Sequence, residues 1–137
     1  MEVNLDTNIL FRALISHGIV VLLLFDFRLK VNAPERMREE FYTHKEEIME
    51  KSQLSEEDFH AAAALLFEKI NFISLENYQQ FLPEAKRLLG EHTKDAEFIA
   101  LCLMNGAKLW TYEKLLFELG FGISTKEISQ KLYGNSE

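Results

Sequence analysis

The sequence predicts an α/β fold: a three-layer α/β/α sandwich with a central, mostly parallel sheet of four to five short strands. Short apolar segments of four or five residues alternate along the chain with longer segments of helical spacing. Such alternation implies parallel strands joined by crossover helices, which cover the two faces of the sheet. The 137 residues contain no internal repeat and no linker rich in Gly, Ser or Pro, so we expect one domain over residues 1–137.

The strands are predicted from short apolar or alternating stretches bounded by turn-forming or capping residues. The first stretch leads directly into Asp6-Thr7-Asn8, residue types that cap a helix N-terminus. The second is stopped by Pro34, which suits the first turn of the helix that follows. The expected strands are residues 2–5, 30–33, 71–75 and 108–111, with a last strand or turn at 122–124.

The helices are predicted from apolar spacing and from their capping residues. Ser55 precedes an acid by three positions, a variant of the capping box, Thr93 is suited to cap a helix, and Asn105-Gly106 closes one. The apolar run after Gly18 fits a buried helix or a strand, and we favour helix. The expected helices are residues 9–16, the run after Gly18, a segment from 35, a segment from 55, 79–89, 95–104, 112–119 and a segment from 125.

Composition limits the class of protein. The strongly apolar run at residues 18–24 is far shorter than the roughly 20 residues of a membrane span, and MEVNLD has no features of a secretory signal. We therefore expect no membrane contact and a cytoplasmic location. The net charge of -7 argues against a passive nucleic-acid binder, because affinity for phosphate normally comes from a basic face. This argument does not apply to a nuclease whose carboxylates are neutralised by metal.

The sequence lacks the motifs of several other kinds of functional site. The single Cys102 excludes an intramolecular disulfide and is expected in the core, as is Trp110. The sequence has no Gly-rich phosphate loop, no GxSxG elbow and no Cys/His pair suited to nucleophilic catalysis. The histidines are too far apart for a zinc pattern, and only His92 lies close to a candidate acid, Asp95; the four are His17, His44, His60 and His92.

Acidic residues follow predicted strand ends or begin helices at several places. Asp6 comes directly after the first strand, Asp95 starts a helix, and Glu113 lies just beyond the KLWT strand. Glu40 joins them from the helix after Pro34. Each acid alone has an ordinary explanation, as a helix cap, a partner of the helix dipole or part of a charged surface. Together, with hydroxyl and amide neighbours such as Thr7, Asn8 and Thr111, they offer the oxygen ligands that Mg²⁺ and Mn²⁺ prefer.

Three separated segments resemble the PIN-domain family, in the family's order and over nearly the whole chain. They are LDTNIL at residues 5–10, APERMREEF at 33–41 followed by HKEEI, and KDAEFIALCLMNGAKLWTYEKLL at 94–116. The third-acid region and the "WT, any residue, acid" signature are the most specific of these. The resemblance implies that Asp6, Glu40 and Asp95 are the first, second and third metal-binding acids.

The resemblance also implies roles for neighbouring residues. Glu113 stands where the family usually has aspartate, and its extra methylene would shift a metal site, bind through water or contribute less. Glu40 is preferred to Glu39 because the family's acid immediately precedes an apolar residue, here Phe41, so Glu39 should point to solvent. Asn8 would orient Asp6 or a metal-bound water, and Thr111 would hydrogen-bond a carboxylate or water. Glu97 is expected to be merely exposed.

The function implied by the resemblance is a Mg²⁺- or Mn²⁺-dependent endoribonuclease with RNA as its substrate. Many relatives are toxins neutralised by an antitoxin, so an antitoxin protein is an expected partner, and family habit favours a homodimer. Two alternatives stay open. One is a catalytically weakened PIN-like module that binds RNA or protein, and the other is a metal-dependent hydrolase of different phosphate esters. The basic residues Arg12, Lys94 and Lys114 receive no assigned role.

Overall fold

The sheet of this protein is parallel throughout, as the sequence predicted. A computed structural model describes residues 1–16 and 18–134, and in that part of the chain five strands form one sheet of order β3-β2-β1-β4-β5. Every neighbouring pair of strands is parallel. The strands are β1 (Glu2–Leu5), β2 (Lys30–Pro34), β3 (Ile70–Ile73), β4 (Lys108–Trp110) and β5 (Gly122–Ile123).

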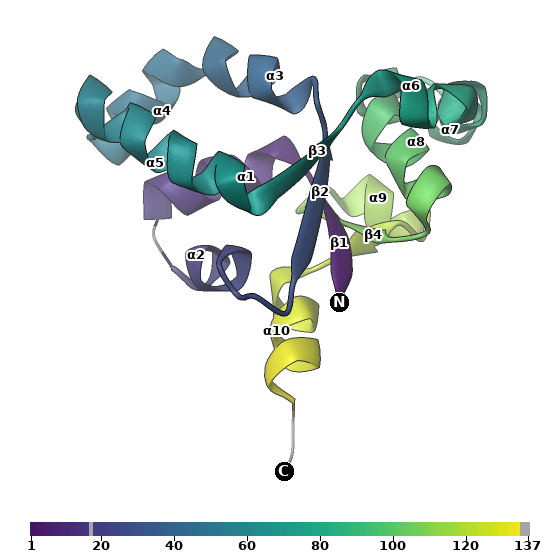
Figure 1. Ribbon diagram of the computed structural model, residues 1–137. Coiled ribbons are helices and arrows are strands. Elements are labelled where there is room, and N and C mark those ends of the chain that lie inside the picture. The colour runs from purple at the N-terminus through teal and green to yellow at the C-terminus, as the bar shows by residue number, and fades with distance from the viewer. Residues whose placement is uncertain (17, 135–137) are drawn as a thin grey trace.

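Helices cover both faces of the sheet. Figure 1 shows α1 to α5 on one side of the strands and α6 to α8 on the other, so the predicted three-layer α/β/α arrangement is confirmed. The α-helices are α1 (Thr7–Ser16), α2 (Ile19–Leu24), α3 (Met37–Thr43), α4 (Lys45–Ser52), α5 (Glu56–Lys69), α6 (Leu75–Tyr78), α7 (Leu82–Leu89), α8 (Ala96–Asn105), α9 (Lys114–Glu118) and α10 (Thr125–Tyr133).

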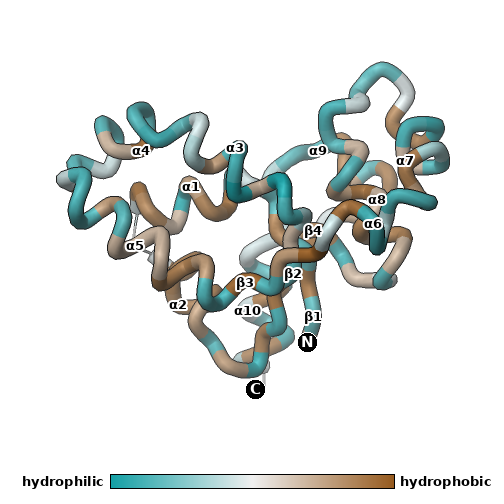
Figure 2. Tube along the Cα trace, turned by 45° about the horizontal axis from the view of Figure 1, so that its top comes forward, coloured by the Kyte–Doolittle hydropathy of each residue, from teal (hydrophilic) through white to brown (hydrophobic). Residues whose placement is uncertain are grey.

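The core lies where α8 crosses the middle of the sheet. The segment from Ala96 to Cys102 is buried almost without interruption, because α8 packs on β1, β2 and β4 and is itself covered by α7. Figure 2 shows the result, with hydrophobic residues along α8 and mainly hydrophilic residues along the peripheral α4. Cys102 and Trp110 are both buried, as the sequence predicted. In the described residues no helix has the length and hydrophobicity to cross a membrane.

The segment predicted as one helix from residue 35 is two helices. The chain leaves helical geometry at His44, with φ -99° and ψ 15°, and this residue ends α3 and begins α4. The imidazole packs edge-on against the Phe11 ring of α1, with 5.3 Å between ring centres. A tertiary contact therefore accompanies a break that local apolar spacing did not reveal.

Other boundaries differ by a few residues, for local reasons. The predicted helix over residues 79–89 is a 3-10 turn, Gln79–Phe81, followed by α7, because Pro83 has no N–H and fits only the start of a helix. The strand predicted at 71–75 is Ile70–Ile73, since Ser74 already begins α6. The helix predicted at 112–119 is shorter at both ends, and Glu113 lies at its N-cap position.

Candidate metal centre

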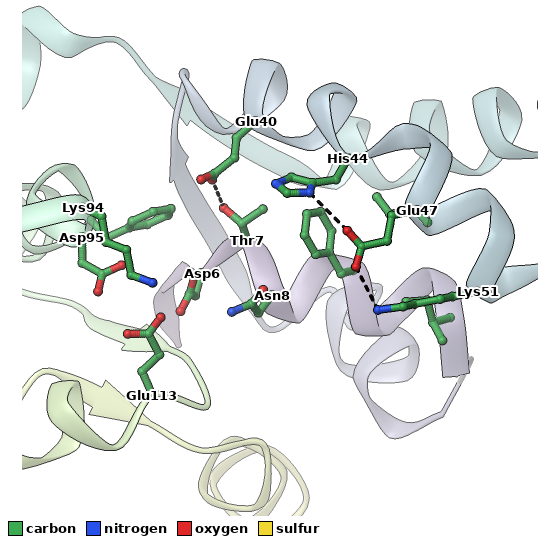
Figure 3. Close-up of a pocket in the computed structure, with 14 residues that line it drawn as sticks. Asp6, Thr7, Asn8, Glu40, His44, Glu47, Lys51, Lys94, Asp95 and Glu113 are labelled. Carbon is green, nitrogen blue, oxygen red and sulfur yellow. Dashed lines mark hydrogen bonds and ion pairs between the residues drawn. The ribbon is translucent and has the colours of Figure 1, made fainter. Parts of the chain in front are cut away.

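The candidate site lies at the carboxyl edge of the sheet, beside its central strand. β1 has β2 on one side and β4 on the other, so the order of the strands reverses there, and open parallel sheets place their sites outside such a point. Asp6 follows β1 directly, and its backbone N–H donates to the carbonyl of Trp110 at the end of β4. A pocket of about 420 Å³ opens at this edge, and Asp6, Glu40, Asp95 and Glu113 all line it (Figure 3).

Asp6 is the most deeply placed of the four acids. Its residue is only 4% exposed, and its carboxylate accepts a 2.6 Å hydrogen bond from Thr111 Oγ1 and another from the backbone N–H of Asn8. Burial raises the pKa of Asp6, an effect that these two hydrogen bonds oppose and the negative charges of Glu113 and Glu40 reinforce. The Asp6 carboxylate is thus held in a place where its charge is not compensated by a cation.

Asp95 and Glu113 form a carboxyl pair. Asp95 occupies the N-cap position of α8 but makes no side-chain capping bond in the structure, so its carboxyl is available to the pocket. Its side chain is hydrogen-bonded to that of Glu113 instead. Burial is the largest cause of a raised pKa in both, and the neighbouring negative charges add to it.

Glu40 approaches the same pocket from α3. The hydroxyl of Thr7, the first residue of α1, donates a hydrogen bond to Glu40 Oε1 and links the two helices beside Asp6. Glu39 is exposed and is not among the pocket residues, in agreement with the preference for Glu40. Asn8 lines the pocket next to Asp6 with an exposed side chain, whereas Thr111 lies beneath the pocket at 1% exposure and holds Asp6 from there.

The acids share the pocket but do not converge on a single point. Within residues 1–16 and 18–134, no group of three or more His, Cys, Asp or Glu side chains is arranged to hold one metal ion. Glu40 is turned to Thr7, while Asp95 and Glu113 are turned to each other. The geometry is that of separate carboxylates around one cavity, with Glu40 held by a hydroxyl on one side and the Asp95–Glu113 pair on the other.

A comparison with known families identifies the family of the chain. A family model described as the PIN domain matches residues 4–133, which includes all five strands except the first two residues of β1. The chain belongs to the PIN-domain family. No curated protein and no solved structure matched the chain. The family assignment confirms the resemblance given by the three sequence segments, and PIN domains are generally nucleases.

This PIN domain has a second group of pocket residues that the sequence interpretation missed. Beyond Glu40 the cavity continues along α1 and α4, where an apolar floor underlies a polar rim. The residues of this part, here termed the side pocket, are Phe11, Ile15, His44, Glu47, Ile48 and Lys51. Spacings of three and four from His44 to Glu47 to Lys51 indicate one helix face, a signal available in the sequence.

Glu97 is a correction to the sequence interpretation. It was expected to be merely exposed, but its side chain is only 21% exposed and joins two other elements of the fold. Tyr78 Oη donates to one carboxylate oxygen and Arg36 Nη1 to the other, each at 2.6 Å. Glu97 lies in the first turn of α8 and faces α6 and the start of α3, where its charge has a cation and a hydroxyl as partners.

The three basic residues left without a role are placed differently. Lys94 lines the pocket beside Asp95. The Arg12 guanidinium lies over the Tyr112 ring, 5.2 Å from its centre, and Lys114 has a side chain that is 91% exposed near Glu118. Only Lys94 therefore reaches the acids, and His92, the histidine singled out from the sequence, is not among the pocket residues, whereas His44 is.

Proposed function

We propose that this PIN domain is an endoribonuclease that depends on Mg²⁺ or Mn²⁺. The observation that carries the proposal is the gathering of four acids, distant in sequence, in one pocket at the carboxyl edge of the sheet. A structural role alone would not bring a nearly buried carboxylate and a carboxyl pair together, since like charges so arranged repel and their burial is unfavourable. Clusters of this kind mark functional sites more often than packing solutions.

The chemistry of the donor set fits a hard divalent cation. All four side chains present carboxylate oxygens, and Mg²⁺ is usually bound through one or two carboxylates while it keeps several waters. The absence of a preformed three-acid group among the described residues is compatible with this mode, which needs only two. Asp6 and Asp95 would hold the ion, with Glu40 and Glu113 close enough in the pocket to bind through water.

When bound, Mg²⁺ or Mn²⁺ supplies a nucleophilic water at neutral pH and stabilises negative charge on the phosphodiester. The protein's own contribution is to fix the acids. Thr111 holds Asp6 through its hydroxyl, and the backbone N–H of Glu113 donates to that hydroxyl at 3.0 Å, which orients it toward Asp6. Thr7 holds Glu40, so each of two acids is restrained by a threonine. Lys94, at the pocket wall, would attract the phosphate group.

A weaker candidate is a PIN-like module that binds RNA or protein without cutting. The carboxyl pair favours it, because Glu113 is one methylene longer than the family's usual aspartate and its side chain is hydrogen-bonded to Asp95. If catalysis is lost in this way, we expect the protein to bind RNA without cleaving it. A hydrolase of other phosphate esters would instead cleave small phosphodiesters and leave RNA intact.

We also propose a protein partner, either the antitoxin of a toxin–antitoxin pair or a second copy of the chain. Large apolar side chains are exposed on α2 and the turn after it, with Leu22 at 65% and Phe27 at 90%. Exposed apolar groups gathered on one element are typical of interaction sites. A cytoplasmic location remains a prediction.

The decisive experiment measures cleavage of labelled single-stranded RNA with Mn²⁺ or Mg²⁺, with EDTA, and with an Asp6→Asn, Asp95→Asn double variant. We expect metal-dependent cleavage that the double variant loses. A Glu39→Gln variant is the matched control, because Glu39 is a neighbouring acid outside the pocket. No cleavage of varied RNAs by the folded, metal-loaded protein would refute the ribonuclease and select the binding module.

A further inference from the structure

The pocket extends well beyond its acids, into the side pocket along α1 and α4. A cation with its waters needs only the acidic end, whereas the whole cavity of about 420 Å³ falls in the range of small-ligand sites, about 300–1,000 Å³. Figure 3 shows Asp95 and Lys94 at one end, His44, Glu47 and Lys51 at the other, and Glu40 between them. The side pocket is therefore continuous with the acids and has room for a further chemical group.

The floor and walls of the side pocket are apolar and partly aromatic. Ile48 is 1% exposed and closes the floor, and the Phe11 ring is in edge contact with the His44 imidazole. Aromatic and apolar surfaces of this kind accept the face of an unpaired nucleobase, through stacking that does not depend on which base is present. A charged phosphate would find no such complementarity on these apolar side chains.

The rim carries hydrogen-bonding groups held in a fixed arrangement. Lys51 Nζ lies 2.9 Å from Glu47 Oε2, and His44 Nδ1 lies 3.4 Å from Glu47 Oε1, so Glu47 connects the two cationic or donor groups. The Glu47 carboxylate has further lone pairs to accept from a base, and the ammonium of Lys51 has further protons to donate. The hydrogen bond from Lys51 is also the largest cause of the lowered pKa of Glu47.

We infer that the side pocket binds one unpaired nucleotide of the substrate, next to the phosphodiester positioned at the acids. The base lies on the surface of the half-buried Phe11 and Ile15, and His44, Glu47 and Lys51 bond its edge. This inference rests on the proposed ribonuclease function, and it adds that the chain recognises single-stranded RNA through a flipped-out nucleotide. His44, Glu47 and Lys51 are then specificity-determining residues, not catalytic ones.

A second cavity, of about 270 Å³, shares Glu40, Lys94 and Phe98 with the first and offers a competing location. It is lined by three cations, Arg36, Lys86 and Lys94, but Arg36 is already engaged by Glu97. Its character suits the backbone of a strand more than a base. Lys86 belongs to this cavity and not to the side pocket, so it provides a matched control for Lys51.

The test is the binding of the four nucleoside 5′-monophosphates to the Mg²⁺-loaded protein, measured by isothermal titration calorimetry. These ligands have no phosphodiester to cleave, so the readout does not depend on activity. We expect at least one to bind, and we expect His44→Ala and Lys51→Ala to weaken it by about fivefold or more, while Lys86→Ala changes it by less than about twofold. All three positions are at the surface, and circular dichroism checks that the variants fold.

Three results would overturn the inference. The first is the absence of nucleotide binding at about 10 mM, and the second is binding that His44→Ala and Lys51→Ala leave unchanged. The third is binding that only Lys86→Ala abolishes, which would place the nucleotide in the second cavity. RNA cleavage by the wild-type protein is measured in parallel. If the wild type binds nucleotides in the side pocket but does not cleave RNA, the proposed activity alone is refuted. If it cleaves RNA but His44→Ala and Lys51→Ala bind nucleotides as tightly as the wild type, the side-pocket assignment alone is refuted.

Discussion

Removal of the Asp6 charge should stabilise the metal-free protein at alkaline pH. Asp6 is 4% exposed, and burial raises its pKa above that of an unfolded chain, so the folded state binds this proton more tightly than the unfolded state does. The stability linked to the proton is complete below the unfolded pKa, near pH 4, and is lost as pH rises through the folded pKa. Asparagine keeps an acceptor oxygen for Thr111 without the charge.

The magnitude follows from proton linkage. Each additional proton bound by the folded state changes the free energy of unfolding by about 1.4 kcal/mol per pH unit, within the window between the two pKa values. Single stabilising substitutions commonly gain about 0.5–2 kcal/mol. We therefore expect Asp6→Asn to exceed the wild-type stability by about 1 kcal/mol at pH 8 and to match it below the unfolded pKa, near pH 4, where the stability linked to the proton is complete.

The assay is urea unfolding in EDTA at several pH values, followed by circular dichroism. Glu39→Gln is the control for the loss of one negative charge from a protein of net charge -7, because Glu39 is exposed and outside the pocket. With Mn²⁺ present the wild type should be more stable than Asp6→Asn, because the wild type alone retains the full metal site. A difference that does not change with pH, or an Asp6→Asn variant that is less stable than wild type at pH 8 in EDTA, would refute the reasoning.

Three further predictions concern the same pocket. Thr111→Val removes a buried donor to Asp6 and should lower the free energy of unfolding by about 1.5–3 kcal/mol in urea; a loss below about 0.5 kcal/mol would contradict the role given to this hydroxyl. Mn²⁺ at about 100 times its dissociation constant should raise that free energy by about 2.7 kcal/mol in wild type and by much less in Asp6→Asn, Asp95→Asn. Glu113→Gln should lower RNA cleavage by about tenfold or more, whereas Glu113→Asp, the residue more usual in the family, should keep it; equal rates in all three would exclude Glu113 from the site.

The strands and acids were predictable because their signals are local. β1 alternates in polarity and is followed at once by Asp6, and the parallel order then places the end of β4, with Thr111, beside it. Asp95 and Glu113 were found in the same way, at the starts of helices. The identity of the family, by contrast, came from the order of three segments, since no single acid distinguishes a metal ligand from a helix cap.

The partners of each acid could not be read from the sequence. The bond from Thr7 to Glu40 joins residues 33 positions apart, and that from Thr111 to Asp6 joins residues 105 apart, so both depend on how α3 and β4 pack. The spacing of the side-pocket residues on α4 was present in the sequence, but the pocket itself was not predicted. A continuous helix from residue 35 was predicted, and it concealed the break at His44 that accompanies the contact of this residue with Phe11.

The distribution of charge explains how an acidic protein is suited to a polyanionic substrate. Of the net charge of -7, a large share lies in one pocket, at side chains whose charges repel one another and a phosphate alike. Divalent metal would reverse the sign of that interaction at one place only. Lys94 would then act on the phosphate, while Lys51, held by Glu47, would contact the base. Affinity for RNA should therefore be conditional on metal, while the rest of the acidic surface continues to discourage non-specific binding.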